Sequence, residues 1–492
     1  MSWAEPLYTA DEMRAAEVAY EGPTLELMER AGTNVAKEIL GRFPDARRIS
    51  VWCGTGANGG DGFAVASELV GAGRECVVRL LGPEEKIAGD AAVTLGRARE
   101  AGVPLVDEPT PADVVVDALF GTGFSGKSRP EAARAIEQLN AAGGPVVAVD
   151  LPSGVDASTG RVEGAAVRAT LTVTFHARKL GHVVAPGRFH AGEVVVADIG
   201  LEATPTRHRR ATARLLELVP RRGERDNKYS AGSVLVVGGS VGLTGAPSLT
   251  SEAALRAGAG IVTACVPASL NVVFEHRLVE VMTRPCPDED GAMTPDAADA
   301  ILESAERAGA IALGPGLGRT DGTRALVGFL LHRLDRPVVL DADGLWALAG
   351  HLDWVFSRDA ATVLTPHAGE LGRLLGRPSG WVAANRLDAV QAGADDAGVV
   401  VLLKGADTLV AGPGRDPVVV DLGNPGLATA GSGDVLTGVV AAFLAKGMDG
   451  ALAAAAAAAC CGVASQVAAE SHGQAGMIAR DVVEALSPAL SG

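Results

Sequence analysis

The chain has 492 residues, an apolar share of 48% and a formal net charge of −16. This length favours roughly two to four domains, and the acidic balance without a basic block argues against nucleic acid or a membrane as partner. The six cysteines show neither CxxC spacing nor a zinc pattern, and the N-terminus lacks the features of a signal peptide. We therefore expect a cytoplasmic protein.

Residues 1–45 carry apolar side chains at helical spacing, including Met28, Val35 and Ile39, which predicts one or two amphipathic helices. From Arg48 onward, short β-branched runs alternate with helical stretches. Nearly continuous apolar strands of this kind indicate a parallel sheet covered on both faces. The predicted strands of this half are Ile49–Cys53, Cys76–Leu81, Asp113–Leu119, Val146–Asp150, Leu171–Phe175 and Val194–Ile199.

The alternation lapses around Glu202–Asp226, where we place the boundary between domains 1–215 and 216–492. The basic cluster, Arg207–Arg210 with Arg221, Arg222 and Arg225, falls in this region and is interpreted as a solvated connector. Beyond it the α/β alternation resumes. The predicted strands are Val234–Val237, Ile261–Val266, Val279–Met282, Ala310–Leu313, Val338–Leu340, Thr362–Thr365, Val399–Leu403, Thr408–Val410 and Val418–Asp421.

The closing part, Val435 to Leu486, is predicted to be largely helical. Within it, Gly450–Ala469 has no charge and is long enough to cross a membrane. Because the segment is mostly alanine, which gains little from transfer into lipid, we interpret it as a closely packed core helix.

Four motifs follow predicted strands of the first half: GTGANGGDGFAVA (Gly54–Ala66), VDALFGTGFSGK (Val116–Lys127), VDLPSGVDASTG (Val149–Gly160) and HARKLGHVVAPG (His176–Gly187). The first leads from a strand into a helix, an arrangement that suits a pyrophosphate. Over about residues 5–200, the four motifs in this order resemble the YjeF N-terminal family, the NAD(P)H-hydrate epimerases. One departure is Ala57, where that family commonly has a second asparagine.

This resemblance implies a Rossmann-like three-layer αβα sandwich with Asp150 as the acid/base group. It also implies a potassium ion held near the side-chain oxygens of Asn58, Asp117 and Ser153. The alternative for Asp150 is a structural carboxylate at the PSG turn, and for Lys127 an exposed lysine without a role. The implied hydrate-binding residues are Asn58, Gly59, Gly60, Asp61, Gly62, Gly121, Thr122, Gly123, Phe124, Lys127 and Asp150.

In the second half, the stretch NPGLATAGSGDVLTG (Asn424–Gly438) reads as a glycine-containing loop that feeds a helix. Glycines let backbone amides approach a phosphate, and the helix start adds partial positive charge. The carboxylate of Asp434 is unfavourable beside a phosphate unless it takes a proton from an attacking hydroxyl. The alternative is that Asp434 only caps the helix.

Five further motifs lie at predicted strand ends: Asn227–Gly260, LGPGLG (Leu313–Gly318), DADGL (Asp341–Leu345), TPHAGE (Thr365–Glu370) and LLKGADTLV (Leu402–Val410). Together with the GSGD loop, they resemble the ribokinase-like carbohydrate kinases, and more closely the ADP/ATP-dependent NAD(P)H-hydrate dehydratases, over about residues 227–488. The resemblance implies a ribokinase-like αβα domain. Related vitamin kinases often carry asparagine where this sequence has His367.

The second resemblance implies that the hydrate contacts Ala246, Gly316, His367 and Asp434. The adenine nucleotide would lie at Lys404, Gly405, Ala406, Asp407, Thr408 and Gly433. Magnesium is implied with ADP or ATP as phosphoryl donor. For His367 the alternative is a structural role; Glu370 either holds magnesium through water or caps a helix, and Asp341 and Asp343 either assist magnesium or are structural.

Taken together, the resemblances imply an enzyme that epimerises the R and S hydrates of NAD(P)H and dehydrates the S form at the expense of ADP or ATP, with ADP favoured. Phosphorylation would turn the ring hydroxyl into a good leaving group. One alternative is a vitamin-type kinase fused to a dinucleotide-binding domain, and another is a non-catalytic nucleotide sensor. We expect the chain to form a homo-oligomer.

Overall fold

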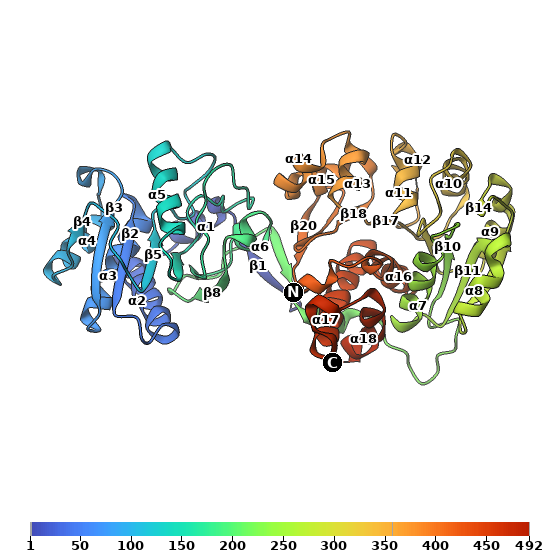
Figure 1. Ribbon diagram of the computed structural model, residues 1–492, viewed down its shortest axis with the longest axis horizontal. Coiled ribbons are helices and arrows are strands. Elements are labelled where there is room, and N and C mark those ends of the chain that lie inside the picture. Colours follow the sequence, from blue (N-terminus) through green and yellow to red (C-terminus); the bar gives the residue numbers. More distant parts are fainter. Residues whose placement is uncertain (1, 357, 492) are drawn as a thin grey trace. The chain divides into compact units, whose positions relative to one another are not determined.

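The computed structural model describes residues 2–356 and 358–491. It divides into two compact units, which are described separately. The N-terminal unit is Pro6–His208, and the C-terminal unit combines Met1–Glu5 with Arg209–Gly492 (Figure 1). That residues 1–215 and residues 216–492 each carry a separate activity stays a prediction.

The N-terminal unit is built on a seven-stranded sheet in the order β4-β3-β2-β5-β6-β7-β8, in which every pairing is parallel. Helices α2–α4 pack on one face, and α5 packs on the other through Ile136 and Leu139. The predicted parallel sheet is therefore confirmed. The strands are β2 (Arg48–Cys53), β3 (Glu75–Leu80), β4 (Leu105–Val106), β5 (Val114–Ala118), β6 (Val146–Val149), β7 (Leu171–Phe175) and β8 (Glu193–Ala197). The helices are α1 (Ala10–Val18), α2 (Thr24–Arg42), α3 (Ala57–Gly71), α4 (Asp90–Glu100), α5 (Pro130–Asn140) and α6 (Leu180–Val183).

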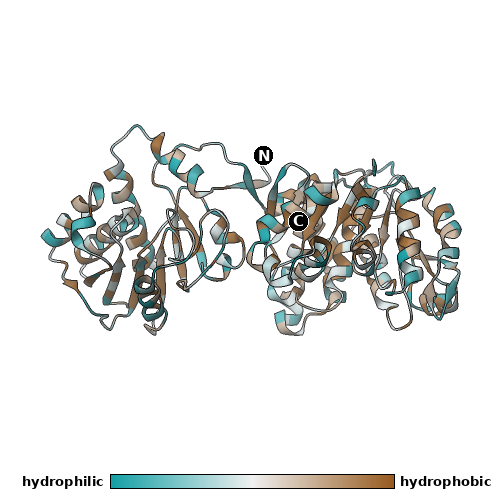
Figure 2. Ribbon diagram, turned by 90° about the horizontal axis from the view of Figure 1, so that it is seen from above, coloured by the Kyte–Doolittle hydropathy of each residue, from teal (hydrophilic) through white to brown (hydrophobic). Residues whose placement is uncertain are grey.

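The C-terminal unit contains an eleven-stranded sheet in the order β1-β9-β20-β19-β18-β17-β16-β15-β10-β11-β12. The run from β18 to β12 is parallel, whereas β18, β19 and β20 pair antiparallel. In both units the strands carry the most apolar sequence (Figure 2). The strands are β1 (Ala4–Leu7), β9 (His208–Ala211), β10 (Ser233–Val237), β11 (Ile261–Pro267), β12 (Met282–Cys286), β15 (Ala310–Leu313), β16 (Val338–Leu340), β17 (Thr362–Leu364), β18 (Val400–Leu403), β19 (Thr408–Gly412) and β20 (Arg415–Val420); a separate hairpin pairs β13 (Asp288–Glu289) with β14 (Ala292–Met293).

Helices cover this sheet as the predicted αβα class requires. One face is packed by α7, α16, α17 and α18, whose buried side chains share one apolar core with the strands. The helices of the unit are α7 (Gly245–Arg256), α8 (Asn271–Arg277), α9 (Ala298–Ala305), α10 (Asp321–Arg333), α11 (Asp343–Leu348), α12 (Asp353–Phe356), α13 (Ala368–Leu375), α14 (Ser379–Ala384), α15 (Arg386–Ala397), α16 (Ser432–Ala445), α17 (Gly450–Gly476) and α18 (Ala479–Ser491).

The prediction that the basic cluster is a solvated connector is wrong for Arg210. This residue lies in β9, which pairs with β20 in the C-terminal unit. Its guanidinium contacts Asp421 Oδ1 at 2.8 Å and Glu5 Oε2 at 3.0 Å. The basic cluster therefore contributes a sheet strand whose cation is neutralised by two carboxylates, because the extreme N-terminus returns to this unit.

A second difference concerns the edge strand β12. The sequence predicts a strand over Val279–Met282, but the strand begins at Met282, and Val279 is 86% exposed. The strand contains Arg284 and Pro285, residues that suit a sheet edge and weaken an apolar strand pattern.

Helix α17 contains the uncharged segment. Among the described residues it is the one helix long and apolar enough to cross a membrane, yet 67% of its most apolar window is buried inside the unit. Its alanines pack in the same core as α16 and α18. The prediction of a core helix is confirmed.

Helices α7 and α16 approach each other closely at Gly438. A Cβ atom added there would overlap the carbonyl oxygen of Thr250 and come within 3.0 Å of Ala253 Cβ. Because the overlap involves a backbone carbonyl, neither helix can move away without a substantial cost in free energy.

We expect Gly438→Ala to lower the free energy of unfolding of the C-terminal unit by about 1–3 kcal/mol, although alanine is the better helix former. Urea unfolding measures this. The matched control is Gly322→Ala in α10, where an added Cβ makes only ordinary contacts at 3.6 Å or more. Equal stability of the two variants would contradict the close packing.

Candidate functional site

Asp150 follows β6 at the carboxyl end of the N-terminal sheet. Its φ of 64° lies in the left-handed region, which a non-glycine residue adopts only when its surroundings enforce it. The backbone N–H of Asp150 donates to the carbonyl of Val173 at 2.8 Å, and the side chain is buried. The strand end therefore presents this carboxylate in a fixed orientation.

The side chain that fixes Asp150 is Lys179, which the sequence analysis did not select. Lys179 is fully buried, and its Nζ donates to Asp150 Oδ1 at 2.6 Å, to Thr174 Oγ1 at 2.8 Å and to the Phe175 carbonyl at 2.9 Å. Burial alone raises the pKa of Asp150, but the charge and hydrogen bond of Lys179 outweigh it and hold that pKa below its ordinary value. Asp150 is therefore ionised at neutral pH.

His182 supports the same arrangement from α6. Its Nδ1 accepts the backbone N–H of Lys179 at 2.9 Å, so its Nε2 carries the proton and donates to the Asp150 carbonyl at 2.7 Å. Burial and the neighbouring Lys179 charge lower the pKa of His182 to about 4, which keeps the ring neutral. The KLGH sequence inside the fourth motif was the available signal for both residues.

The three residues expected near potassium form a connected group. Ser153 donates to Asp117 through Oγ at 2.6 Å and through its backbone N–H at 2.8 Å, and its Oγ accepts the Phe120 N–H at 2.9 Å. Asn58 reaches the same loop, since a Cβ added at Gly121 would lie 3.0 Å from Asn58 Oδ1. Burial raises the pKa of Asp117 to about 6, against the hydrogen bonds from Ser153.

Asn58 gives a test of whether these residues fit a cation. Its side chain is buried, and within the described residues neither its Oδ1 nor its Nδ2 has a hydrogen-bond partner. A buried amide without partners costs free energy, so an oxygen-seeking ligand at Oδ1 would relieve that cost. The oxygen donors of Asn58, Asp117 and Ser153 fit a hard cation such as potassium.

The glycines of the NGGDG sequence lie in the first turns of α3. A Cβ at Gly59 would overlap the Gly54 carbonyl, one at Gly60 would lie 2.7 Å from the Met28 side chain, and one at Gly62 would lie 2.7 Å from Cys53 Sγ. These positions therefore need glycine for the packing of α3 against its neighbours.

Asp61 lies within electrostatic reach of Asp150. Burial, followed by the negative charges of Asp150 and Glu17, raises the pKa of Asp61 well above its ordinary value. This shift favours the protonated form of Asp61 beside an Asp150 whose pKa is lowered. This pair combines a proton donor and a proton acceptor.

The loop after β5 carries the remaining predicted epimerase residues, Gly121, Thr122, Gly123, Phe124 and Lys127. The rings of Phe120 and Phe124 stack with centroids 5.3 Å apart, while Lys127 is exposed. The loop joins the Asn58 group through Gly121.

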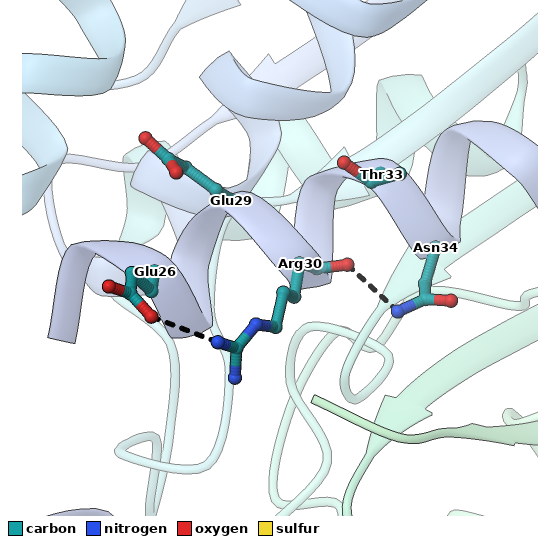
Figure 3. Close-up of a pocket in the computed structure, with 5 residues that line it drawn as sticks. All are labelled: Glu26, Glu29, Arg30, Thr33 and Asn34. Carbon is teal, nitrogen blue, oxygen red and sulfur yellow. Dashed lines mark hydrogen bonds and ion pairs between the residues drawn. The ribbon is translucent and has the colours of Figure 1, made fainter. Parts of the chain in front are cut away.

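A cavity of about 430 Å³ lies elsewhere in this unit, along α2 (Figure 3). Glu26 and Glu29 line it, and Arg30 on the same helix face donates to Glu26 at 2.9 Å. None of the predicted site residues lines this cavity.

In the C-terminal unit, Asp434 lies in the first turn of α16, next to Gly433. Burial and the negative charges of Asp341 and Asp343 raise its pKa to about 7, although Lys404 opposes the shift. A carboxyl group with this pKa is suited to general base catalysis near neutral pH.

Lys404 brings the predicted residues together. Its Nζ donates to Asp341 Oδ1 at 2.8 Å, lies 3.8 Å from Glu370 Oε2, and would be 3.4 Å from a Cβ at Gly433. Burial lowers the pKa of Lys404, but Asp341, Glu370 and Asp434 more than offset this and keep it above the ordinary value.

His367 and Glu370 form a capping box at the start of α13. The His367 Nδ1 accepts the Gly369 N–H at 3.0 Å, and Glu370 Oε2 accepts the His367 N–H at 2.9 Å. The His367 side chain is 59% exposed and its Nε2 lies 3.5 Å from Glu370 Oε1. Capping is therefore present for both residues, with the outer edge of the ring open to a ligand.

The acidic pair after β16 is engaged by protein groups. Asp341 Oδ2 accepts the Thr437 hydroxyl at 2.7 Å, while Asp343 accepts the Gly318 N–H at 3.0 Å and the Arg319 Nε at 2.8 Å. Among described residues, no cluster of three or more His, Cys, Asp or Glu side chains suits a metal. Magnesium at this site would thus depend on phosphate and water oxygens beside Glu370 or Asp341, which matches its usual coordination.

Asp343 also orients the turn around Gly316. A Cβ at Gly316, whose φ is 60°, would lie 3.0 Å from Leu243 Cβ and 3.3 Å from Ala246 Cβ. Two predicted hydrate-contacting positions, Ala246 and Gly316, are therefore adjacent.

The predicted nucleotide turn 404–408 is supported by Arg386, which the sequence analysis also missed. Arg386 Nε donates to Asp407 Oδ2 at 2.9 Å, and both side chains are buried. A Cβ at Gly405 would overlap the Arg386 guanidinium. Asp407 thus shapes the turn from inside, and Lys404 and Thr408 flank it.

The geometry defines a class of protein: a two-part α/β protein with one carboxylate site at the strand ends of each sheet, the second of them beside a lysine and the first turn of a helix. Residues 24–181 match the family model described as YjeF-related protein N-terminus, and residues 234–488 match that described as NAD(P)H-hydrate dehydratase. This chain belongs to the family of bifunctional NAD(P)H-hydrate repair enzymes.

Curated relatives match over nearly the whole length. The bifunctional NAD(P)H-hydrate repair enzyme Nnr of Moorella thermoacetica is 42% identical, covering 98% of this chain and 96% of the relative, and that of Salinibacter ruber is 38% identical, covering 97% and 95%. A crystal structure of the ADP/ATP-dependent NAD(P)H-hydrate dehydratase from Bacillus subtilis, co-crystallized with ATP and Mg²⁺, is 27% identical with a TM-score of 0.50 and covers 57% of this chain and 96% of that one.

We expect Lys179→Met to reduce the free energy of unfolding of the N-terminal unit by about 3–5 kcal/mol near neutral pH, because it leaves Asp150 buried and unpaired. Without the lysine, burial raises the pKa of Asp150 above its unfolded value. The deficit should then shrink as the pH falls towards about 5 and Asp150 takes up a proton.

Urea unfolding at several pH values measures this effect, with Lys127→Met as the control at an exposed lysine. A deficit that does not change with pH would contradict the assigned role of Lys179.

Proposed function

We propose that this chain repairs hydrated nicotinamide cofactors in two steps, an epimerisation in the N-terminal unit and an ADP- or ATP-driven dehydration in the C-terminal unit. The near-full-length relatives, which are named bifunctional NAD(P)H-hydrate repair enzymes, support the pairing. The observation that carries the chemistry is Asp434, a carboxyl group with a pKa of about 7 at the start of α16 beside Lys404.

In the dehydration, Asp434 takes the proton from the ring hydroxyl as that oxygen attacks the terminal phosphorus of the nucleotide. An O–P bond forms and the nucleotide leaves with its bridging oxygen. The phosphorylated oxygen then departs as phosphate, and the neighbouring ring carbon loses a proton to restore the double bond. The α16 amides near Gly433 and the charge of Lys404 stabilise the transferring phosphoryl group.

Magnesium, when bound, neutralises charge on the phosphates, and Glu370 or Asp341 would hold it. Adenine nucleotide would lie along Lys404–Thr408, and the hydrate between Gly316, Ala246 and His367. We favour ADP as the donor in this chain.

In the epimerisation, the hydroxyl must leave one face of the ring carbon and water must return to the other. In this proposal Asp61, whose pKa is raised, donates a proton to the departing hydroxyl, and Asp150, whose pKa is lowered, activates the returning water. Potassium, when bound by Asn58, Asp117 and Ser153, would offset the negative charge of the dinucleotide.

A cytoplasmic location is part of the proposal. Six free and buried cysteines support it, since an oxidising compartment would favour disulfides.

We expect Asp434→Asn to abolish the recovery of NADH absorbance when both hydrate epimers are supplied with ADP and magnesium, while ADP still binds. In the unaltered chain, the dehydration rate should rise with pH through about 7, because the base must be deprotonated. Normal turnover by Asp434→Asn would refute the assignment of this base.

Asp150→Asn separates the two activities. It should keep a fast phase of NADH recovery from the S epimer and leave a slow remainder from the R epimer, which then depends on spontaneous epimerisation. A single fast phase from the mixture would contradict the role of Asp150.

A further inference from the structure

A cavity of about 340 Å³ in the C-terminal unit lies outside the site described above. It is formed where the segment 216–222, the end of α7, the end of α16 and the end of α18 meet. We propose that this cavity is a second anion-binding site, which takes a small molecule with a phosphate-type group and an apolar part.

The cavity is strongly cationic. Arg221, Arg222, Arg256 and Lys446 line it, and none of its lining residues is acidic. Burial and the charge of Arg222 lower the pKa of Lys446, as expected where like charges are held together. An anion would offset this repulsion.

Two of these cations already have a structural role. Lys446 Nζ donates to the Ala257 carbonyl at 2.9 Å, and Arg222 donates to the Ala259 carbonyl at 2.8 Å, so both satisfy carbonyls at the end of α7. Neutral acceptors satisfy donors without cancelling positive charge. The structural role of this pair therefore does not account for the cationic character of the cavity.

The other two cations are available to a ligand. Within residues 2–356 and 358–491, the side chains of Arg221 and Arg256 make neither an ion pair nor a hydrogen bond, and both residues are exposed. Guanidinium groups bind phosphate oxygens through paired N–H donors. Leu216 and Leu490 supply an apolar wall, which favours a ligand that also has an apolar part.

The cavity is separate from the dehydratase site. Helix α16 begins beside Asp434 and ends at Ala445, and its fourteen residues separate the two ends by about 20 Å. The end of α16 lies against Gly232 and Gly309, which precede β10 and β15, whereas the dehydratase site lies at the carboxyl ends of the strands. An anion bound here would not occupy the nucleotide site.

The test uses phenyl phosphate as the probe and the full chain at low ionic strength, with saturating ADP and magnesium to fill the nucleotide site. Titration calorimetry compares the unaltered chain with Arg221→Gln/Arg256→Gln, a double variant that leaves the α7 carbonyl partners intact. The matched control is Arg225→Gln, an exposed arginine that follows the segment 216–222 and does not line the cavity. Binding of ADP checks that each variant is folded.

We expect phenyl phosphate to bind the unaltered chain and the control equally, and the double variant at least about tenfold more weakly. Inorganic phosphate should bind more weakly than phenyl phosphate. The site would be overturned if phenyl phosphate did not bind the unaltered chain, if the double variant bound it equally well, or if the control lost as much affinity as the double variant. Equal affinities for phenyl phosphate and inorganic phosphate would overturn the assignment of an apolar part to the ligand.

Discussion

Each unit organises its polar site around one lysine at the carboxyl end of its sheet, fully buried in one unit and largely buried in the other. Lys179 is fully buried beside Asp150, and the Lys404 side chain is 21% exposed beside Asp341. A buried charge is stable only when a counter-charge and hydrogen bonds replace water. This constraint decides which carboxylates may ionise, and so the chemistry that each site can perform.

The two lysines lead to opposite outcomes for the predicted acid/base groups. Lys179 contacts Asp150 itself and lowers its pKa, whereas burial and the charge of Asp150 raise the pKa of Asp61. Lys404 is instead hydrogen-bonded to Asp341, and this leaves Asp434 close to negative charge with a pKa of about 7. Activation of a hydroxyl at neutral pH needs a base with a pKa near 7, as at Asp434. Exchange of a hydroxyl for water at a ring carbon instead needs a proton donor and a proton acceptor together.

The sequence was sufficient for the architecture wherever strands are apolar throughout. Ala310–Leu313 and Val338–Leu340 were predicted to the residue, because buried parallel strands carry uninterrupted apolar runs. Strands at or next to a sheet edge did not follow this pattern: the edge strand β12 contains Arg284 and Pro285, and β9, next to the edge strand β1, is rich in arginine. The pairing of Arg210 with Glu5 depends on a contact between residues far apart in the chain, which no local pattern encodes.

The same contrast between local pattern and tertiary contact applies to the site residues. Asp150 and Asp434 stand in glycine-containing motifs at strand ends and could be selected from sequence. Lys179 stands in the fourth motif and Arg386 in none of the motifs, and neither was selected, because nothing local distinguishes a lysine or an arginine that becomes buried from one that remains solvated. His367 shows the converse: the motif predicted a ligand contact, and the structure adds a capping role that uses the other ring nitrogen. One side chain can serve both, since capping fixes the orientation in which Nε2 meets the site.

Close packing between α7 and α16 gives the dehydratase site its rigidity. Gly438 allows the two helices to touch through backbone atoms, and Thr250 donates from α7 to the Asp434 carbonyl at 3.1 Å. The helix that carries the proposed base is therefore held by the helix that carries Ala246. The same two helices end at the cationic cavity, where Lys446 links the end of α16 to the Ala257 carbonyl after α7. Since both ends of the pair are tied, a displacement of either helix would have to break contacts at the catalytic end and at the cavity together.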